Sequence, residues 1–386
     1  MNPSSVKINS FQIDVVAFFK NALLFLVSFA LVIIFAEFVL RAVYPQRLTH
    51  QRENRYTINE NMLNWKGQNK THEYNAVLEF NRLGMRGPEI SYKKAEGIRR
   101  AMFLGDSFVA GAQVNWNEHM ANLVEEEFFA EKLPVQVVNY GVSGWDNVQE
   151  LIYLKNEGYK FSPDALYLFV YPGNDINGNY GRYYEEGLSQ YMDRQDLNLL
   201  YRLQEKKNPV LSVKEYLLTH SHLFTLIKLF GESSKLNYRL KGIQRQLHMI
   251  NIPSRPETVK LSHDEKIEKS WALFQALMTD FSSFCHDKGI RFVVIMVPHV
   301  TQVYPDRHEG EYEKVVSRYW GDIQGYERAM AIVRNLKIPV VDLLPAFLKE
   351  KADADLYYHE DFHWTPAGHA LAAKILAERI NPDFAQ

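Results

Sequence analysis

Two uninterrupted apolar runs of strand length constrain the fold of this 386-residue chain more than any other feature. Residues 165–171 read ALYLFVY, and residues 291–297 read RFVVIMV before a proline. A strand that is apolar at every position is covered on both faces, as strands of parallel sheets are. The sequence therefore predicts a sheet with helices on both sides.

Weaker patterns add elements of both kinds. Shorter strands are predicted at residues 100–104, 135–139 and 340–341, and helices at 120–129, 147–157 and 366–380. In the last helix we expect Leu371, Ile375 and Leu376 to face the core. Strands that alternate with helices predict a parallel, three-layer α/β domain over residues 100–386.

Residues 180–268 interrupt this alternation with mostly amphipathic sequence. We expect a helical insertion that packs on the core. A lid over the site and a surface resting on the membrane are the alternatives. Residues 45–99 are polar and are predicted to form a linker and a lead-in to the domain.

The N-terminal residues 1–44 contain the apolar run ALLFLVSFALVIIFAEFVL at 22–40, broken only by Ser28 and Glu37. This is about the length that spans a bilayer. A cleaved signal peptide and a buried core helix are alternatives, but no Ala-x-Ala site follows the run. We predict an uncleaved, single-pass membrane anchor.

Composition excludes some classes of partner. The net charge of −2 gives no electrostatic footprint for nucleic acid, so no nucleic-acid partner is expected. Cys285 is the only cysteine, so no disulfide can form within the chain. With 46% hydrophobic residues, the chain has ample material for a core.

Four short blocks follow one another at predicted strand ends: FLGDSF at 103–108, VSG at 142–144, GND at 173–175 and DFHW at 361–364. A serine hydroxyl needs a base within hydrogen-bond reach and a third group that orients the base. Ser107 follows a strand and a tight turn, and His363 precedes the last helix at the same sheet edge. The imidazole N–H has two candidate acceptors, Asp361 and Glu360, while Asp106 is expected to fix the turn.

Acyl transfer also needs donors aimed at the oxygen that becomes negative. The backbone N–H of Ser107 is one candidate. Gly144 has no side chain that would block its N–H, and Asn174 has an amide N–H. The sequence therefore predicts an oxyanion hole made by these three residues.

In these blocks the chain resembles the SGNH hydrolases, also called the GDSL family, from about residue 81 onward apart from the insertion. The resemblance implies a flavodoxin-like α/β/α sandwich, Ser107 as nucleophile, Gly144 and Asn174 as oxyanion donors, and His363 as base. Many relatives carry the acid three residues before the histidine. Anchored, acetyl-transferring relatives often carry it two before, ahead of His-Trp, so we expect Asp361. Residues 81–87 (NRLGMRG) resemble a lead-in segment of anchored members.

One competing motif is present. Residues 359–363 (HEDFH) fit the H-E-x-x-H pattern of zinc proteases. That pattern needs a long helix, whereas the surrounding sequence favours a loop entering a helix. The zinc hypothesis also leaves Ser107, Gly144 and Asn174 unexplained, so we expect neither a metal nor a cofactor.

The sequence thus predicts a membrane-anchored serine esterase that removes an O-acyl group, most simply acetyl, from a glycan. The alternatives are an O-acetyltransferase with the same triad and a catalytically silent subunit of a polysaccharide or membrane complex. The aromatic residues near strand ends are expected to belong to the core or rim, with a substrate-binding surface as the alternative: Trp145, Tyr171, His299 and Trp364.

The orientation of the anchor is predicted from two conflicting signals. Arginines dominate the C-terminal flank of the apolar run, and the positive-inside rule alone would place the domain in the cytoplasm. That rule weakens for a long domain after one helix, and the resemblance favours the other side. We expect residues 56–386 to be extracytoplasmic.

Overall fold

The computed structural model describes residues 15–44, 66–185, 216–217, 220–233, 263–305 and 323–384. A five-stranded parallel sheet with the order β4-β3-β5-β6-β7 forms its centre. The strands are β3 (Arg99–Gly105), β4 (Val135–Gly141), β5 (Ala165–Val170), β6 (Arg291–Met296) and β7 (Val340–Asp342). Counted along the chain this order is 2-1-3-4-5, the flavodoxin-like arrangement. The predicted fold class is confirmed.

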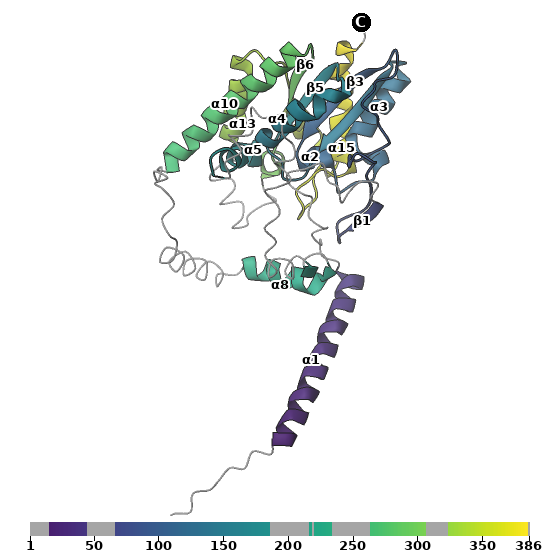
Figure 1. The fold of residues 1–386 in the computed structure, drawn as a ribbon, viewed down its shortest axis with the longest axis vertical. Coiled ribbons are helices and arrows are strands. Elements are labelled where there is room, and N and C mark those ends of the chain that lie inside the picture. The colour runs from purple at the N-terminus through teal and green to yellow at the C-terminus, as the bar shows by residue number, and fades with distance from the viewer. Residues whose placement is uncertain are drawn as a thin grey trace, which may run out of the picture.

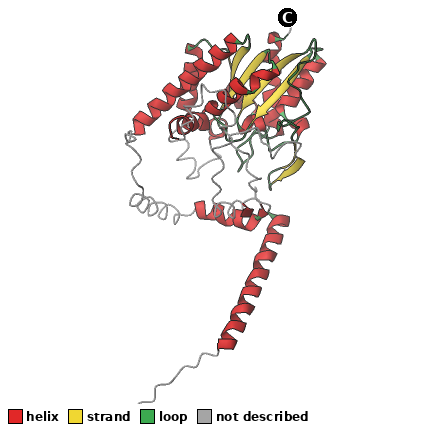
Figure 2. Cartoon of the chain, in the orientation of Figure 1, coloured by secondary structure: helices red, strands yellow, loops and turns green. Residues whose placement is uncertain are grey.

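Helices cover both faces of the sheet (Figures 1 and 2). One face packs on α4 (Asn147–Asn156), α5 (Pro172–Tyr180), α10 (His263–Asp287) and α13 (Ile323–Asn335). The other packs on α2 (Ser107–Ala110), α3 (Met120–Ala130), α11 (Val300–Val303), α14 (Leu344–Glu350) and α15 (Pro366–Ile380). Successive strand residues point to opposite sides, so Met102 and Phe103 enter different cores.

Short helical turns complete the domain. They are η2 (Trp116–Glu118), η3 (Gly158–Phe161), the π-helical η4 (Gly181–Glu185) and η7 (Asn381–Asp383). Most of the insertion expected at 180–268 lies outside the described residues. Within it the structure describes α8 (His222–Ser233), and α10 already begins at His263.

The segment before the sheet is more than a lead-in. Residues 66–79 form an antiparallel hairpin of β1 (Lys66–Lys70) and β2 (Asn75–Glu79). Asn69 donates from Nδ2 to the carbonyl of Ala112 at 2.7 Å, which ties the hairpin to the turn after α2. The sequence did not predict this hairpin, because its strands are mostly polar, with one short apolar stretch in β2. The linker predicted further upstream, at 45–65, lies outside the described residues.

The N-terminal helix α1 (Val15–Val43) extends from the domain (Figure 1). Its segment Phe18–Val43 contains an 18-residue window with a mean hydropathy of 2.8 and is long and apolar enough to cross a membrane. By length and composition this helix is a candidate membrane anchor or signal segment.

Helix α15 shows how packing alters a helical pattern. Its inward face is formed by Ala372, Ala373 and Leu376, whereas Leu371 and Ile375 are only half-buried. The prediction that these two residues face the core is confirmed, because both pack against it, although they are less buried than Leu376. The small alanines lie innermost because α3 packs closely against this helix.

Candidate active site

The structure brings Ser107 and His363 together although 256 residues separate them. Strand β3 ends at Gly105, Asp106 caps α2, and Ser107 is the first residue of that helix. The Oγ of Ser107 lies 2.7 Å from Nε2 of His363. Both residues are half-buried at the carboxyl edge of the sheet, where ligands bind in open α/β folds.

Helix α2 packs almost directly on the end of β4. A Cβ placed on Gly141 would lie 2.1 Å from the backbone nitrogen of Ala110. Any side chain there would push α2 away, and with it Ser107. The glycine that ends β4 is therefore required for the position of the nucleophile candidate.

The loop before α15 holds the acid–base pair. Nδ1 of His363 lies 2.6 Å from Oδ1 of Asp361, whose side chain is 4% exposed. Between them Phe362 has a φ of +67°, a left-handed conformation that bulky residues rarely adopt. This turn lets the Asp361 carboxylate fold back onto the ring of His363.

Glu360 points elsewhere. Its side chain is 62% exposed and its Oε1 lies 3.2 Å from Nε2 of His72. Of the two candidate acids, only Asp361 reaches His363 in the structure.

The H-E-x-x-H segment is a loop and not a helix, so its two histidines do not share one helix face. Within the described residues, no group of three or more His, Cys, Asp or Glu side chains is placed to hold a metal ion.

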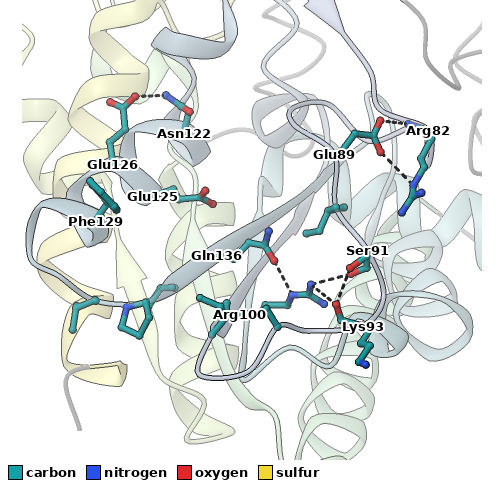
Figure 3. Close-up of a pocket in the computed structure, with 16 residues that line it drawn as sticks. Arg82, Glu89, Ser91, Lys93, Arg100, Asn122, Glu125, Glu126, Phe129 and Gln136 are labelled. Atoms are coloured by element: carbon teal, nitrogen blue, oxygen red, sulfur yellow. Dashed lines mark hydrogen bonds and ion pairs between the residues drawn. The ribbon is translucent and has the colours of Figure 1, made fainter.

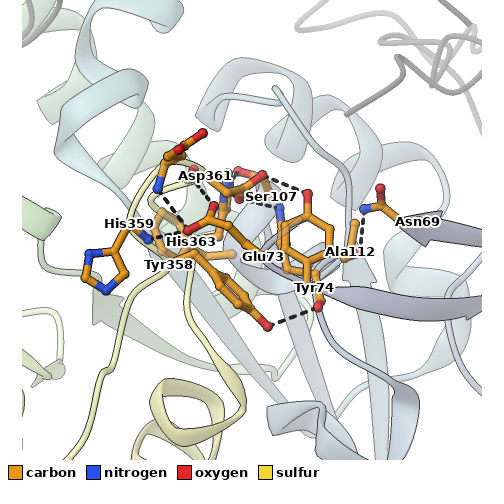
Figure 4. Close-up of polar contacts among 12 residues, drawn as sticks. Asn69, Glu73, Tyr74, Ser107, Ala112, Tyr358, His359, Asp361 and His363 are labelled. Carbon is orange, nitrogen blue, oxygen red and sulfur yellow. Dashed lines mark hydrogen bonds and ion pairs between the residues drawn. The ribbon is translucent and has the colours of Figure 1, made fainter. Parts of the chain in front are cut away.

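The hairpin clamps this acid–base loop (Figure 4). The carboxylate of Glu73 accepts hydrogen bonds from three successive backbone N–H groups, those of residues 359, 360 and 361. The hydroxyl of Tyr74 donates to Oδ2 of Asp361 at 2.8 Å, and Nε2 of Gln113 donates to Oδ1 at 2.9 Å. The loop is thus fixed from outside the sheet, by residues that no sequence motif marked.

Replacing Tyr74 with phenylalanine is expected to lower kcat about tenfold while KM changes little. A hydrogen bond to a charged group contributes about 1.5–3 kcal/mol, and its loss lets Asp361 move relative to His363. Steady-state kinetics on an activated acetyl ester measures the effect. Tyr92→Phe is the matched control, because its hydroxyl bonds to Glu157, away from the site. Equal kcat values for the two variants would remove Tyr74 from the positioning of Asp361.

The three predicted oxyanion donors follow neighbouring strand ends. Asn174 lies in the first turn of α5, and its Nδ2 donates to Oδ2 of Asp106 at 2.9 Å. Oδ1 of Asp106 accepts from the N–H of Phe108. Asp106 therefore orients Asn174 as well as the turn before Ser107, a second role that the sequence did not reveal.

Gly144 lies in the loop after β4, which is tied to β3 by the bond from Val142 N to Gly105 O. Its φ is +76°, and a Cβ there would meet nothing within 4 Å. The expected reason for this glycine, freedom from a blocking side chain, was therefore incomplete. The backbone conformation is what favours glycine at this position.

Four buried carboxyl groups lie behind these loops: Asp106, Asp146, Glu150 and Asp175. Burial raises the pKa of the Asp146 carboxyl to about 7, although Nε of Arg182 lies 3.1 Å from its Oδ2. Burial also raises the pKa values of Glu150 and Asp175 well above their usual range. Their neighbours are largely amides, such as Asn147, which donates to Glu150 at 2.9 Å.

Asp146 should make the folded state less stable as pH rises. Its pKa is about 7 when folded and near 3.8 when exposed, so the folded state holds the extra proton between these values. Its contribution is complete below about pH 4 and is lost as pH rises through about 7. We expect the melting temperature of the wild type to fall relative to Asp146→Asn between about pH 5 and about pH 8. Parallel melting curves across this range would contradict the assignment.

Beneath α2 lies a buried polar group from the lead-in segment 81–87. The guanidinium of Arg86 donates to the carbonyls of Ala110, Gly111 and Val114. The buried His119 ring lies 3.0 Å from the carbonyl of Val109. These donors satisfy the carbonyls at the end of α2 and hold the helix that carries Ser107.

Two of the four aromatic candidates belong to the core. Trp145 is 3% exposed and Trp364 fully buried, so neither lines a substrate surface. Tyr171 and His299 are half-buried at the rim, with their rings stacked 5.7 Å apart. Tyr171 also contacts Phe108, next to Ser107.

A cavity of about 690 Å³ lies at the opposite end of the strands (Figure 3). It is lined by Arg100 and Gln136 at the starts of β3 and β4, and by Phe129 at the end of α3. Arg100 donates to Gln136 and to several backbone carbonyls, including that of Phe161. These bonds explain Arg100 as a structural residue, and the cavity is remote from Ser107.

Similarity to known proteins is clearest in the last third of the chain. A family model described as the SGNH hydrolase-like domain of the acetyltransferase AlgX matches residues 255–386. This part holds Asp361 and His363, but not Ser107. The probable alginate O-acetylase AlgJ of Pseudomonas fluorescens is 30% identical over 121 residues, which are 31% of this chain. The match spans 28% of that relative.

Solved structures resemble the chain over more of its length but more loosely. A lipase/acylhydrolase from Enterococcus faecalis is 14% identical, with a TM-score of 0.38, and covers 74% of this chain and 96% of its own. The acetyl xylan esterase AlAXEase is 12% identical, with a TM-score of 0.39, and covers 73% and 99%. Residues 255–386 are therefore similar to an SGNH hydrolase-like domain, and they contribute two strands to the parallel sheet, β6 and β7.

Proposed function

We propose that the chain transfers an O-acetyl group to a polysaccharide through an acyl-serine at Ser107. The observation that supports this most is the hydrogen-bonded series from Ser107 through His363 to Asp361, with distances of 2.7 and 2.6 Å. Such a series is what a serine needs to act as a nucleophile near neutral pH.

The proposed reaction has two halves. Oγ of Ser107 attacks the donor carbonyl as Nε2 of His363 takes its proton, and the leaving oxygen then receives that proton. An acceptor hydroxyl next gives its proton to Nε2 and attacks the acyl-serine, and Ser107 regains the proton as it leaves. Asp361 keeps its negative charge throughout and stabilises the imidazolium.

Negative charge on the carbonyl oxygen arises in both halves. The proposed donors are the backbone N–H groups of Ser107 and Gly144 and the side-chain amide of Asn174. Because Asp106 already orients that amide, little reorganisation is needed when the charge forms.

The choice of acceptor rests on the comparisons. The matched family model is described as an acetyltransferase, and the AlgJ relative as an O-acetylase. Both descriptions favour a sugar hydroxyl as acceptor. Hydrolysis, which the sequence favoured first, becomes the second candidate, because Ser107 and His363 are half-buried and water can reach them.

The test uses the full chain in detergent with an activated acetyl ester, with and without an alginate oligosaccharide. Transfer predicts acetylated oligosaccharide by mass spectrometry and less free acetate when the oligosaccharide is present. Acetate release that is indifferent to the oligosaccharide would favour hydrolysis. No turnover, together with no labelling of Ser107 by a fluorophosphonate, would refute both functions.

We further propose that α1 anchors the domain on the extracytoplasmic side of a membrane. The length and hydropathy of Phe18–Val43 support anchoring. A C-terminal reporter that is active only outside the cytoplasm should be active in fusions with the full chain. A silent reporter beside an active cytoplasmic one would reverse the orientation.

A further inference from the structure

Glu37 is the acidic residue in the C-terminal half of α1, which is otherwise apolar except for Arg41. A carboxylate at this place in a membrane helix is unfavourable unless it has partners. Here it accepts hydrogen bonds from the hydroxyl of Ser221 at 2.8 Å and from the N–H groups of His222 and Leu223 at 2.9 Å. These groups form the start of α8, so Glu37 caps that helix.

Arg41 completes the junction. Its Nε donates to Oε1 of Glu37 at 2.9 Å, and its Nη2 donates to the carbonyl of His220 at 2.6 Å. A helix N-terminus carries partial positive charge, which complements the carboxylate of Glu37. The two helices are therefore joined by specific polar contacts, and α8 runs crosswise to α1 (Figure 1).

The position of Glu37 along α1 fixes the depth of this junction. The apolar run at 22–40 contains ~19 residues, which at ~1.5 Å each rise ~29 Å. A bilayer's hydrocarbon core is about 30 Å thick. When α1 crosses a membrane with this run in the hydrocarbon, Glu37 thus lies within one helical turn of the boundary between hydrocarbon and headgroups, and so does the start of α8.

Helix α8 has the side chains that such a position requires. Leu223, Leu226 and Ile227 recur at the spacing of one helical face. Thr225 is buried, whereas Ile227 is 60% exposed and lies about 200° further round the helix. The helix thus buries the polar Thr225 against the protein and exposes the apolar Ile227 on its opposite side.

We propose that α8 lies flat in the headgroup region of the bilayer that α1 crosses, with Ile227 toward the acyl chains. This inference rests on the anchoring proposed above. It gives the domain a second membrane contact beside its tether. The ring of Tyr44, just after α1, stacks on His72 at 4.8 Å, next to the Glu73–Tyr74 clamp. The acid–base loop is thereby held close to the membrane surface.

The test places an environment-sensitive fluorophore at position 227 of the full chain. Cys285→Ala removes the native thiol, and Ile227→Cys provides the labelling site. The protein is reconstituted in phosphatidylcholine vesicles with or without lipids that carry a nitroxide near the headgroup or deep in the chain. We expect blue-shifted emission, and quenching by the shallow nitroxide at least about twofold stronger than by the deep one.

Phe129→Cys is the matched control, because Phe129 is 82% exposed on α3 of the catalytic domain. Its label should be neither shifted nor quenched. The inference would be overturned if the protein floats with the vesicles but the label at 227 shows neither the blue shift nor the quenching, as at position 129. Protein that does not float with the vesicles would instead refute the anchoring.

Glu37→Ala tests the cap itself. The variant should still float with the vesicles through α1, while the label at 227 loses at least about half of its quenching because α8 is no longer fixed at the boundary. Unchanged quenching in this variant would show that Glu37 does not hold α8 at the membrane.

Discussion

Ser107→Ala is expected to lower acyl turnover by ~10³-fold or more, because the members of a triad act as a unit and removal of one abolishes the shared function. Oγ of Ser107 is the atom proposed to form the acyl bond, and alanine leaves no oxygen at that position. Initial rates on an activated acetyl ester measure the loss. A fluorophosphonate should label the wild type and leave the variant unlabelled.

The matched control is Ser283→Ala. Ser283 is exposed on α10, far from the sheet edge that carries the site, and alanine is a good helix former. Its turnover and labelling should equal those of the wild type. Labelling that persists in Ser107→Ala would mean that another residue is the nucleophile.

The sheet was predictable because its strands carry their own signal. In β5 and β6 nearly every residue is apolar, and burial on both faces is the physical reason for that pattern. The motif blocks were predictable for a related reason. The carboxyl ends of parallel strands lie at one edge of the sheet. Ser107 and Asn174 follow neighbouring strands, so their proximity can be predicted without knowing the tertiary packing.

Other features depend on contacts that no local pattern records. The polar strands of the hairpin gave no periodic signal, so the bonds from Glu73 and Tyr74 to the acid–base loop were invisible in the sequence. Trp364 follows His363 directly, yet it points into the core and packs on Phe347. The two adjacent residues thus have different roles, because the backbone points His363 toward Ser107 and Trp364 into the core.

Glu37 is a residue that stands out in the sequence but whose partners cannot be predicted from it. In the sequence it was an interruption of an apolar run, with no stated purpose. Only the fold brings residues 221–223 to its carboxylate, 184 positions later in the chain at the nearest. An isolated charge in an apolar helix therefore points to a partner, but the identity of that partner depends on the tertiary structure.

Asp361→Asn is expected to cost at least ~10²-fold in kcat, and Glu360→Gln less than about twofold. Asparagine keeps the shape of Asp361 but removes the negative charge that, in the proposed mechanism, stabilises the imidazolium of His363. The amide also presents either a donor or a neutral acceptor to Nδ1, which disturbs the tautomer that Ser107 needs. Glu360 has no such contact, since its side chain is 62% exposed and turned toward His72.

The two substitutions are matched, because each replaces a carboxylate with its amide at adjacent positions of one loop. Steady-state rates at several pH values should show the Asp361→Asn loss throughout the range in which the wild type is active. Melting temperatures of both variants, measured alongside, separate a chemical effect from loss of the fold. If Glu360→Gln proves the more damaging, the loop must rearrange during the reaction and the third triad role passes to Glu360.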